Sequence, residues 1–131
     1  MFLNMDISRL HRLAFIVARG HLSMAAALRS IDQLAQAAVP SFAKIIDLSG
    51  VTSDLGPGEL RRLAAQMRRV SDLERGRMAL LVDLERDLFG KRVTEVVGRH
   101  PHAAVFRSLH AARSFVRREL IAPAQEGSHA A

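Results

Sequence analysis

Residues 44–60, KIIDLSGVTSDLGPGEL, contain the transition that decides the fold. The apolar run AKIIDL at 43–48 has the length of a buried β-strand. Serines, glycines and Pro57 follow it, as in a turn, and from Leu60 onward apolar residues recur at helical spacing. The stretch therefore predicts a strand, a loop and a helix in succession.

The residues before this stretch predict two strands and another helix. Met5 and Ile7 alternate with polar residues, as in a half-buried edge strand, whereas LAFIVAR at 13–19 is apolar on both faces, as in a central strand. Ser23 is a suitable N-cap, and Pro40 ends the helix that Ser23 starts. The apolar stripe of this helix is expected at Met24, Ala27, Leu28, Ile31, Leu34, Ala35 and Ala38.

After the helix at 58–70, a further strand–helix unit is expected. MALLV at 78–82 is a short buried strand, and the helix at 85–99 follows Asp83, a capping residue. Glu85 and Asp87 suit the positive end of the helix dipole. The apolar positions expected in these two helices are Leu60, Leu63, Ala64, Met67 and Val70, then Leu88, Phe89, Val93, Val96 and Val97.

The last unit is the strand AAVFR at 103–107 and a helix that Ser108 caps and Pro123 ends. Its apolar positions are expected at Leu109, Ala112, Phe115, Val116 and Leu120. The whole order, ββαβαβαβα, predicts an α/β fold with right-handed crossovers between parallel strands. We expect a mostly parallel five-stranded sheet with four helices and a first strand antiparallel to the second. One domain would occupy residues 1–122, and residues 123–131 would form a flexible C-terminal tail.

Composition narrows the classes of function. With 131 residues, 49% of them hydrophobic, the chain can bury a core of its own. It has no Cys, which excludes disulfides and thiolate metal ligands. No apolar run approaches the roughly 20 residues that span a bilayer. The start lacks a basic segment followed by an apolar one, so we expect a cytoplasmic protein.

The net charge of +6 does not by itself predict nucleic-acid binding. The basic residues run from Arg9 to Arg118 with acids among them, Trp and Tyr are absent, and the six Phe are expected in the core. Proteins that bind nucleic acid usually combine clustered charge with aromatic platforms. The sequence thus disfavours nucleic acid as a partner.

Several stretches resemble the STAS fold of anti-sigma-factor antagonists such as SpoIIAA. IIDLSGVT at 45–52 is similar to the STAS strand and loop, and GELRRLAAQMRRV at 58–70 to the helix after it. DLFGKRVTEVV at 87–97 and AAVFRSLHAARSFVRREL at 103–120 resemble the closing helix–strand–helix. The resemblance covers about residues 5–120 and is greatest to bacterial single-domain SpoIIAA-like, or STAS/SEC14-like, proteins.

This resemblance implies a non-enzymatic regulatory or scaffold module, without a cofactor, that binds another protein such as a kinase or an anti-sigma-like regulator. It also allows a homodimer. In regulatory members a Ser or Thr within Asp-Ser-Ser-Gly, at the start of the second helix, is phosphorylated. Here DLGPG at 54–58 places Leu55 or Gly56 at that position. Ser53 and Thr52 are nearby hydroxyls, offset from the family's acceptor.

The segment 49–58 is the candidate docking site. It follows the carboxyl end of a parallel strand, where open α/β sheets bind ligands, and it leads into a helix N-terminus, which favours anions. Glycines let a partner approach the backbone closely. The same residue types also suit a plain turn and helix cap. The candidate residues are Ser49, Thr52, Ser53, Asp54, Gly56, Gly58, Arg61 and Arg62, and Arg68, Arg69 and the face of the helix at 85–99 extend the surface.

The sequence gives less support for metal binding or catalysis. His100 and His102 could share one side of an extended segment with His110 in reach, but no carboxylate has a companion spacing, and we expect no metal site. Ser49 and Asp47 could be combined with a distant histidine, but nothing in their spacing requires a catalytic arrangement. We therefore assign no catalytic residues.

The alternative function is a carrier or sensor of a small apolar or anionic ligand, which the SEC14-like side of the resemblance implies. A pocket between helices, lined by Met67, Leu88, Phe89 and Phe115, would serve that function. Close packing of protein interiors argues against a large cavity in a chain of 131 residues.

Overall fold

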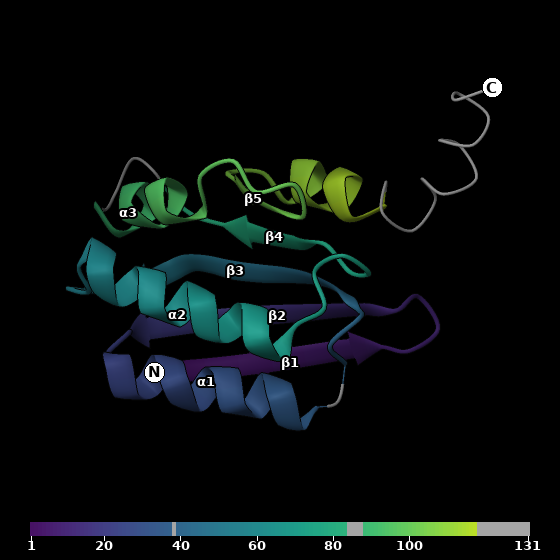
Figure 1. The fold of residues 1–131 in the computed structure, drawn as a ribbon, viewed down its shortest axis with the longest axis horizontal. Helices are drawn as coiled ribbons and strands as arrows, with labels where there is room; N and C mark the ends of the chain where they lie inside the picture. Colours follow the sequence, from purple (N-terminus) through teal and green to yellow (C-terminus); the bar gives the residue numbers. More distant parts are fainter. Residues whose placement is uncertain (38, 84–87, 118–131) are drawn as a thin grey trace.

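A five-stranded sheet with helices on both faces makes up the fold (Figure 1). The computed structural model describes residues 1–37, 39–83 and 88–117. The strands are β1 Phe2–Ser8, β2 Leu13–His21, β3 Ala43–Thr52, β4 Met78–Leu81 and β5 Ala103–Phe106. The helices are α1 Met24–Gln36, α2 Pro57–Val70 and α3 Leu88–Val97, and residues 109–117 are also helical.

The topology confirms the expected α/β architecture. The strands lie in the order β1-β2-β3-β4-β5, with β1 antiparallel to β2 and every later pair parallel. The carboxyl ends of the four parallel strands therefore meet at one edge of the sheet. Within the described part of the chain, no helix is long and apolar enough to cross a membrane.

The strand predicted at 43–48 was too short, because β3 continues to Thr52. Val17 pairs with Asp47 and Arg19 with Gly50, so two residues of β3 lie opposite one residue of β2. This β-bulge interrupts the alternation of inward and outward side chains, which is the signal that sequence reasoning uses for a strand. Of the predicted docking loop at 49–58, residues 49–52 are thus strand and 57–58 are helix, and the loop proper is 53–56.

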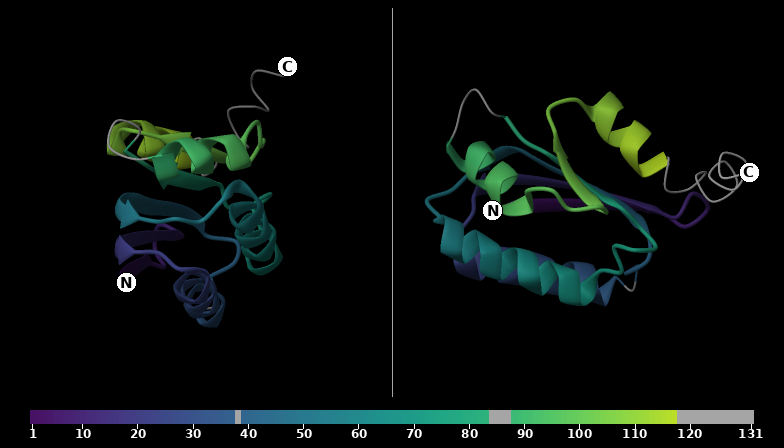
Figure 2. Two further views of the ribbon diagram at one scale, coloured as in Figure 1. Left: turned by 90° about the vertical axis from the view of Figure 1, so that its left-hand side faces the viewer. Right: turned by 45° about the horizontal axis from the view of Figure 1, so that its top comes forward.

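The two faces of the sheet pack against different helices (Figure 2). Ile16 of β2 and Val51 of β3 point to the face covered by α1, α2 and α3. On the opposite face, Ile45 and Ala79 pack against Val116 of the helix at 109–117. The sheet therefore separates two hydrophobic cores.

Some predicted apolar positions face solvent. In α1 the buried residues are Ala26, Ala27, Ile31 and Leu34. Leu28 lies beside this stripe on the side that faces solvent and is 40% exposed. Leu88 begins α3 and is 62% exposed, and Phe2 on the edge strand is equally exposed, so the prediction that all six Phe are buried was wrong. The predicted positions Ala38, Glu85, Asp87, Leu120 and Pro123 and the tail at 123–131 lie outside the described residues.

Lys44 is fully buried at the start of β3. Its Nζ donates to the carbonyl oxygens of Pro40 at 3.0 Å and Phe42 at 2.8 Å, which fastens the turn before the strand. Burial lowers the pKa of Lys44 from 10.5 to about 8, and the carboxylate of Asp72 opposes this shift. Lys44 therefore couples the stability of the fold to pH.

Candidate functional site

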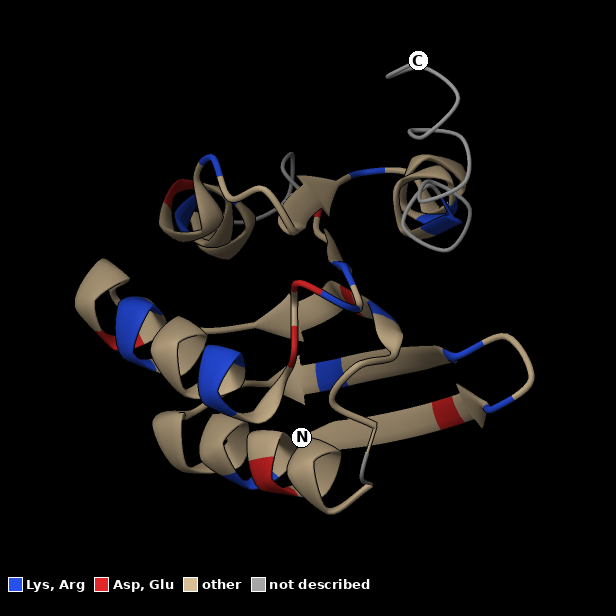
Figure 3. Cartoon of the chain, turned by 45° about the vertical axis from the view of Figure 1, so that its right-hand side comes forward, with Lys and Arg blue, Asp and Glu red and all other residues tan. Residues whose placement is uncertain are grey.

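The segment from β3 into α2 alternates between buried and exposed side chains. Val51, Ser53 and Leu55 point inward, whereas Thr52 and Asp54 point outward. Of the candidate residues, the exposed ones are Ser49, Thr52, Asp54, Gly58, Arg61 and Arg62, while Gly56 is half-buried. The exposed residues from Thr52 to Arg62 form a surface at the carboxyl edge of the sheet. We call this candidate site the docking surface. The blue segments along α2 in Figure 3 are its arginines.

Ser53 is buried and connects two loops. Its Oγ donates to the carbonyl oxygen of Leu22 at 2.7 Å and accepts the backbone N–H of Leu55 at 3.2 Å. The neighbouring backbone N–H of Leu22 donates to the carbonyl oxygen of Thr52 at 2.8 Å. The connection between β2 and α1 thus holds the loop before α2.

Two further hydrogen bonds hold the loop 53–56 from the other side. Arg92 of α3 donates from Nη1 to the carbonyl oxygen of Leu55 at 3.2 Å. Glu59 accepts the backbone N–H of Gly56 at 3.3 Å, which satisfies a free donor at the helix start. Both α2 and α3 therefore fix the backbone that carries the docking surface.

The fold does not require a glycine at position 56 in the loop or at position 58 in α2. A Cβ added at Gly56 or Gly58 would meet no atom within 4 Å, and neither residue has a positive φ. The space beside the backbone at these positions is therefore open.

Asp47 and Ser49 are hydrogen-bonded to each other at the β-bulge of β3. Ser49 donates to Asp47 Oδ1 from its Oγ at 2.6 Å and from its backbone N–H at 2.9 Å. Among the residues that the structure describes, no histidine is hydrogen-bonded to either side chain. Ser49 is therefore not part of a Ser–His–Asp arrangement among these residues.

His100 and His102 lie before β5, whereas His110 lies after it. The rings of His100 and His102 lie 6.1 Å apart before the strand, and His100 Nδ1 accepts the backbone N–H of His102 at 3.0 Å. His110 follows the opposite end of β5, so it does not join them. The part of the chain described by the structure contains no group of three His, Asp or Glu residues placed to hold a metal ion.

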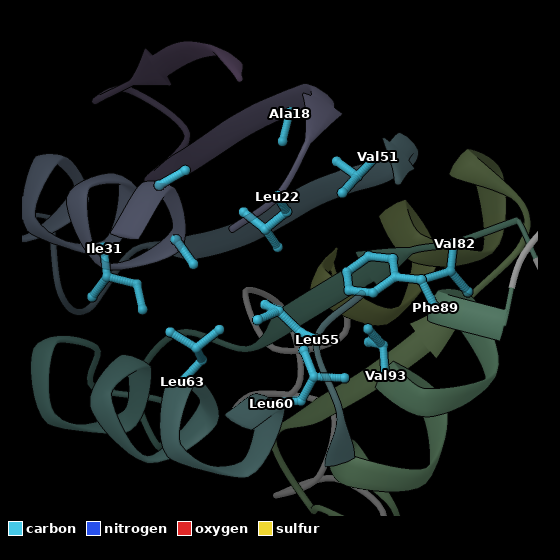
Figure 4. Packing of buried hydrophobic residues seen from close by; sticks show 12 residues of the cluster. Ala18, Leu22, Ile31, Val51, Leu55, Leu60, Leu63, Val82, Phe89 and Val93 are labelled. Atoms are coloured by element: carbon cyan, nitrogen blue, oxygen red, sulfur yellow. The ribbon is translucent and has the colours of Figure 1, made fainter. Parts of the chain in front are cut away.

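A second candidate site lies between the sheet and helices α1–α3 and is partly open to solvent. It is an apolar cavity of about 200 Å³. In Figure 4, Leu22, Ile31, Leu63 and Phe89 point toward one another from the sheet side and the three helices. Residues that line the cavity include Leu3, Ile16, Ile31, Leu63, Met67 and Phe89.

The pocket expected from the sequence lay between helices, and two of its four expected residues line the observed cavity between the sheet and the helices. Met67 and Phe89 line the cavity. Leu88 points to solvent instead, and Phe115 packs on the opposite face of the sheet. The periodicity of a helix identifies its inward side chains but not which face of the sheet they meet, which is why Phe115 was misplaced.

The cavity lies on one side of the sheet. Leu63 and Ile46 line it, whereas Ile45, Ala79 and Ala112 belong to the core on the opposite face. A ligand that enters the cavity would remove apolar side chains from water, which is favourable.

Comparison with known proteins identifies a structural neighbour. No protein-family model matches the chain, and no curated protein matches it. Among solved structures, the chain is similar to an anti-sigma factor antagonist from Mycobacterium paratuberculosis, with a TM-score of 0.62 and 20% sequence identity. The match covers 88% of this chain and 95% of that chain. Together with the sheet order and the antiparallel first strand, this likeness shows that the chain has the STAS fold of SpoIIAA-like proteins.

Proposed function

We propose that the protein is a non-enzymatic, cytoplasmic regulatory or scaffold module that binds another protein through its docking surface. The observation that supports this most is the loop 53–56, whose backbone is held by Leu22, Ser53 and Arg92 before any partner arrives. A surface that is already ordered loses less conformational entropy on binding.

The partner we propose is an acidic surface of a kinase or an anti-sigma-like regulator. The structural neighbour is an anti-sigma factor antagonist, and this likeness motivates the class of partner. Arg61 and Arg62 are both exposed at the first turns of α2. Charge complementarity of this kind raises the association rate and makes it sensitive to salt.

Phosphorylation of the two candidate hydroxyls would have different structural consequences. Thr52 is exposed, so a kinase could reach it while the loop stays closed. Ser53 would first have to release Leu22 and Leu55. A phosphate on Thr52 would add about −1.5 to −2 charges beside Asp54 and would oppose binding of an acidic partner.

Affinity capture with charge-matched variants tests the docking surface. Wild type, Arg61→Glu/Arg62→Glu and Arg113→Glu/Arg117→Glu would be compared as baits in lysate of the source cells. The second variant makes the same charge change on exposed residues of the helix at 109–117. We expect wild type and the second variant to retain one protein that the first variant loses. When that protein is purified, it should bind wild type and the second variant with similar affinity and the first variant more weakly. Equal retention by both variants would reject this surface.

The cavity supports a second function, which is the binding of a small apolar ligand. Native mass spectrometry of the purified protein, followed by organic extraction, would detect such a ligand as a stoichiometric mass difference. The same spectra would report the homodimer that the resemblance allows. A chain that carries no ligand and takes up none from added aliphatic compounds would reject this second function and leave the docking surface untouched.

A further inference from the structure

The cavity has one polar end. Its lining is apolar except for Ser30, Arg68 and His100, and it contains no carboxylate. Ser30 Oγ already donates to the carbonyl oxygen of Ala26 at 2.9 Å. Arg68 lies in the last turn of α2, and His100 lies three residues before the first residue of β5, so both lie at the amino edge of the parallel strands.

Arg68 is available to a ligand. Its side chain is exposed, and across residues 1–37, 39–83 and 88–117 it has no ion-pair partner. Arg68 and His100 are close enough to interact electrostatically, since Arg68 contributes, after burial and His102, to lowering the pKa of His100. The polar end therefore combines the permanently charged guanidinium of Arg68 with the imidazole of His100.

His100 offers a hydrogen-bond donor at this end in either protonation state. Its Nδ1 accepts the backbone N–H of His102, so a neutral ring carries its proton on Nε2. A guanidinium beside an N–H donor suits a carboxylate, which accepts paired hydrogen bonds from arginine. The rest of the cavity suits an aliphatic chain, because it has no other polar side chain besides Ser30.

The volume sets the length of that chain. An apolar cavity of about 150 Å³ holds a benzene molecule of six carbons. The cavity here, of about 200 Å³, accommodates roughly eight carbons on the same scale. We propose that the cavity binds an unbranched aliphatic carboxylate of this size, with its chain between the sheet and α1–α3 and its carboxylate at Arg68 and His100. This inference rests on the second function proposed above and adds the charge and orientation of the ligand.

The methionines provide a built-in readout. Met1, Met5, Met67 and Met78 line the cavity, whereas Met24, the fifth, does not. In protein labelled with ¹³C at the methionine methyl groups, octanoate is expected to shift the NMR signals of Met5, Met67 and Met78 and to leave that of Met24 in place. Uncharged 1-octanol is expected to shift the same signals with lower affinity.

A matched pair of variants tests the orientation. Arg68→Gln removes the cation at the cavity, and Arg69→Gln makes the same change at an exposed neighbour that does not line it. We expect Arg68→Gln to weaken octanoate binding about tenfold, the scale of a lost charged hydrogen bond, and to leave 1-octanol binding unchanged. Arg69→Gln should bind both compounds as wild type does.

The outcomes separate this inference from the function it rests on. If octanoate and 1-octanol bind equally well, or if Arg68→Gln and Arg69→Gln have equal effects, the carboxylate assignment is wrong while the cavity still binds apolar ligands. If neither compound shifts Met5, Met67 or Met78, both the assignment and the second function are wrong. Protein capture at the docking surface is unaffected in every case.

Discussion

Ser53 Oγ donates to the carbonyl oxygen of Leu22 over 2.7 Å and thereby joins the connections that follow β2 and β3. The same Oγ accepts the backbone N–H of Leu55, so one hydroxyl serves two buried backbone groups. A residue that the sequence offered as a modification site is thus also a structural contact beneath the docking surface.

We expect Ser53→Ala to lower the free energy of unfolding by about 1–3 kcal/mol, because both backbone groups would lose their buried partner. Urea denaturation followed by circular dichroism would measure this change. Ser49→Ala is the control, since Ser49 is exposed and bonded only to Asp47 among the described residues. Equal stability of the two variants would show that the Ser53 contacts contribute nothing.

Two glycines should respond oppositely to alanine. A Cβ at Gly76 would overlap the carbonyl oxygens of Ser41 and Phe42, where the turn after α2 approaches the turn before β3. Gly76→Ala is therefore expected to cost about 1–3 kcal/mol or more through overpacking. Gly58→Ala has free space and should leave stability unchanged or raise it by up to about 1 kcal/mol. Thermal unfolding of both variants checks the contrast, and a stable Gly76→Ala protein would contradict the close approach.

Lys44 should make stability rise with pH over a defined window. Its pKa is about 8 in the folded protein and near 10.5 when the chain is unfolded. Between these values the unfolded state binds more protons, so the free energy of unfolding increases with pH, and below about pH 8 this contribution to the slope disappears. We expect wild type to gain stability relative to Lys44→Met between about pH 8 and 10.5, with a constant difference below pH 7.

Lys91→Met provides the comparison for Lys44. Lys91 is the only other lysine and is exposed on α3, and the chain has no Tyr or Cys to titrate in this range. Urea denaturation at four pH values between about 7 and 10.5 would give the difference in free energy of unfolding between wild type and each of the two variants. Parallel pH profiles for the two variants would mean that Lys44 titrates normally in the folded protein.

Enlarging an alanine should have opposite effects in the two cores. Ala27 lines the cavity, whereas Ala112 is 0% exposed in the core on the opposite face. Ala112→Leu is expected to destabilise the protein by about 1–3 kcal/mol, because a close-packed site has no room for three more carbons. Ala27→Leu should be neutral or stabilising and should reduce octanoate uptake. Similar losses of stability in both variants would indicate that the cavity is not available to side chains.

Local sequence patterns predicted the order of strands and helices because each element carries its own periodicity. Ser23 and Ser108 were identified as helix caps, and both Oγ atoms accept a backbone N–H from the first turn. The end of β3 was missed because Ser49 and Gly50 are turn-forming residues, and residues 50–52 are strand because they pair with the last three residues of β2. A pairing partner 31 residues away leaves no local signal at the bulge.

The sequence by itself determined the α/β class, the ββαβαβαβα order and the position of the segment before α2, because periodicity and capping act between residues close in the chain. Only the tertiary structure decided that Ser53 is hydrogen-bonded to Leu22, that Phe115 lies on the far face, and that a cavity of about 200 Å³ lies between the sheet and three helices. These features depend on the distances between elements once they pack. Side-chain spacing along one helix or strand specifies which residues turn inward, but not how much volume remains between them.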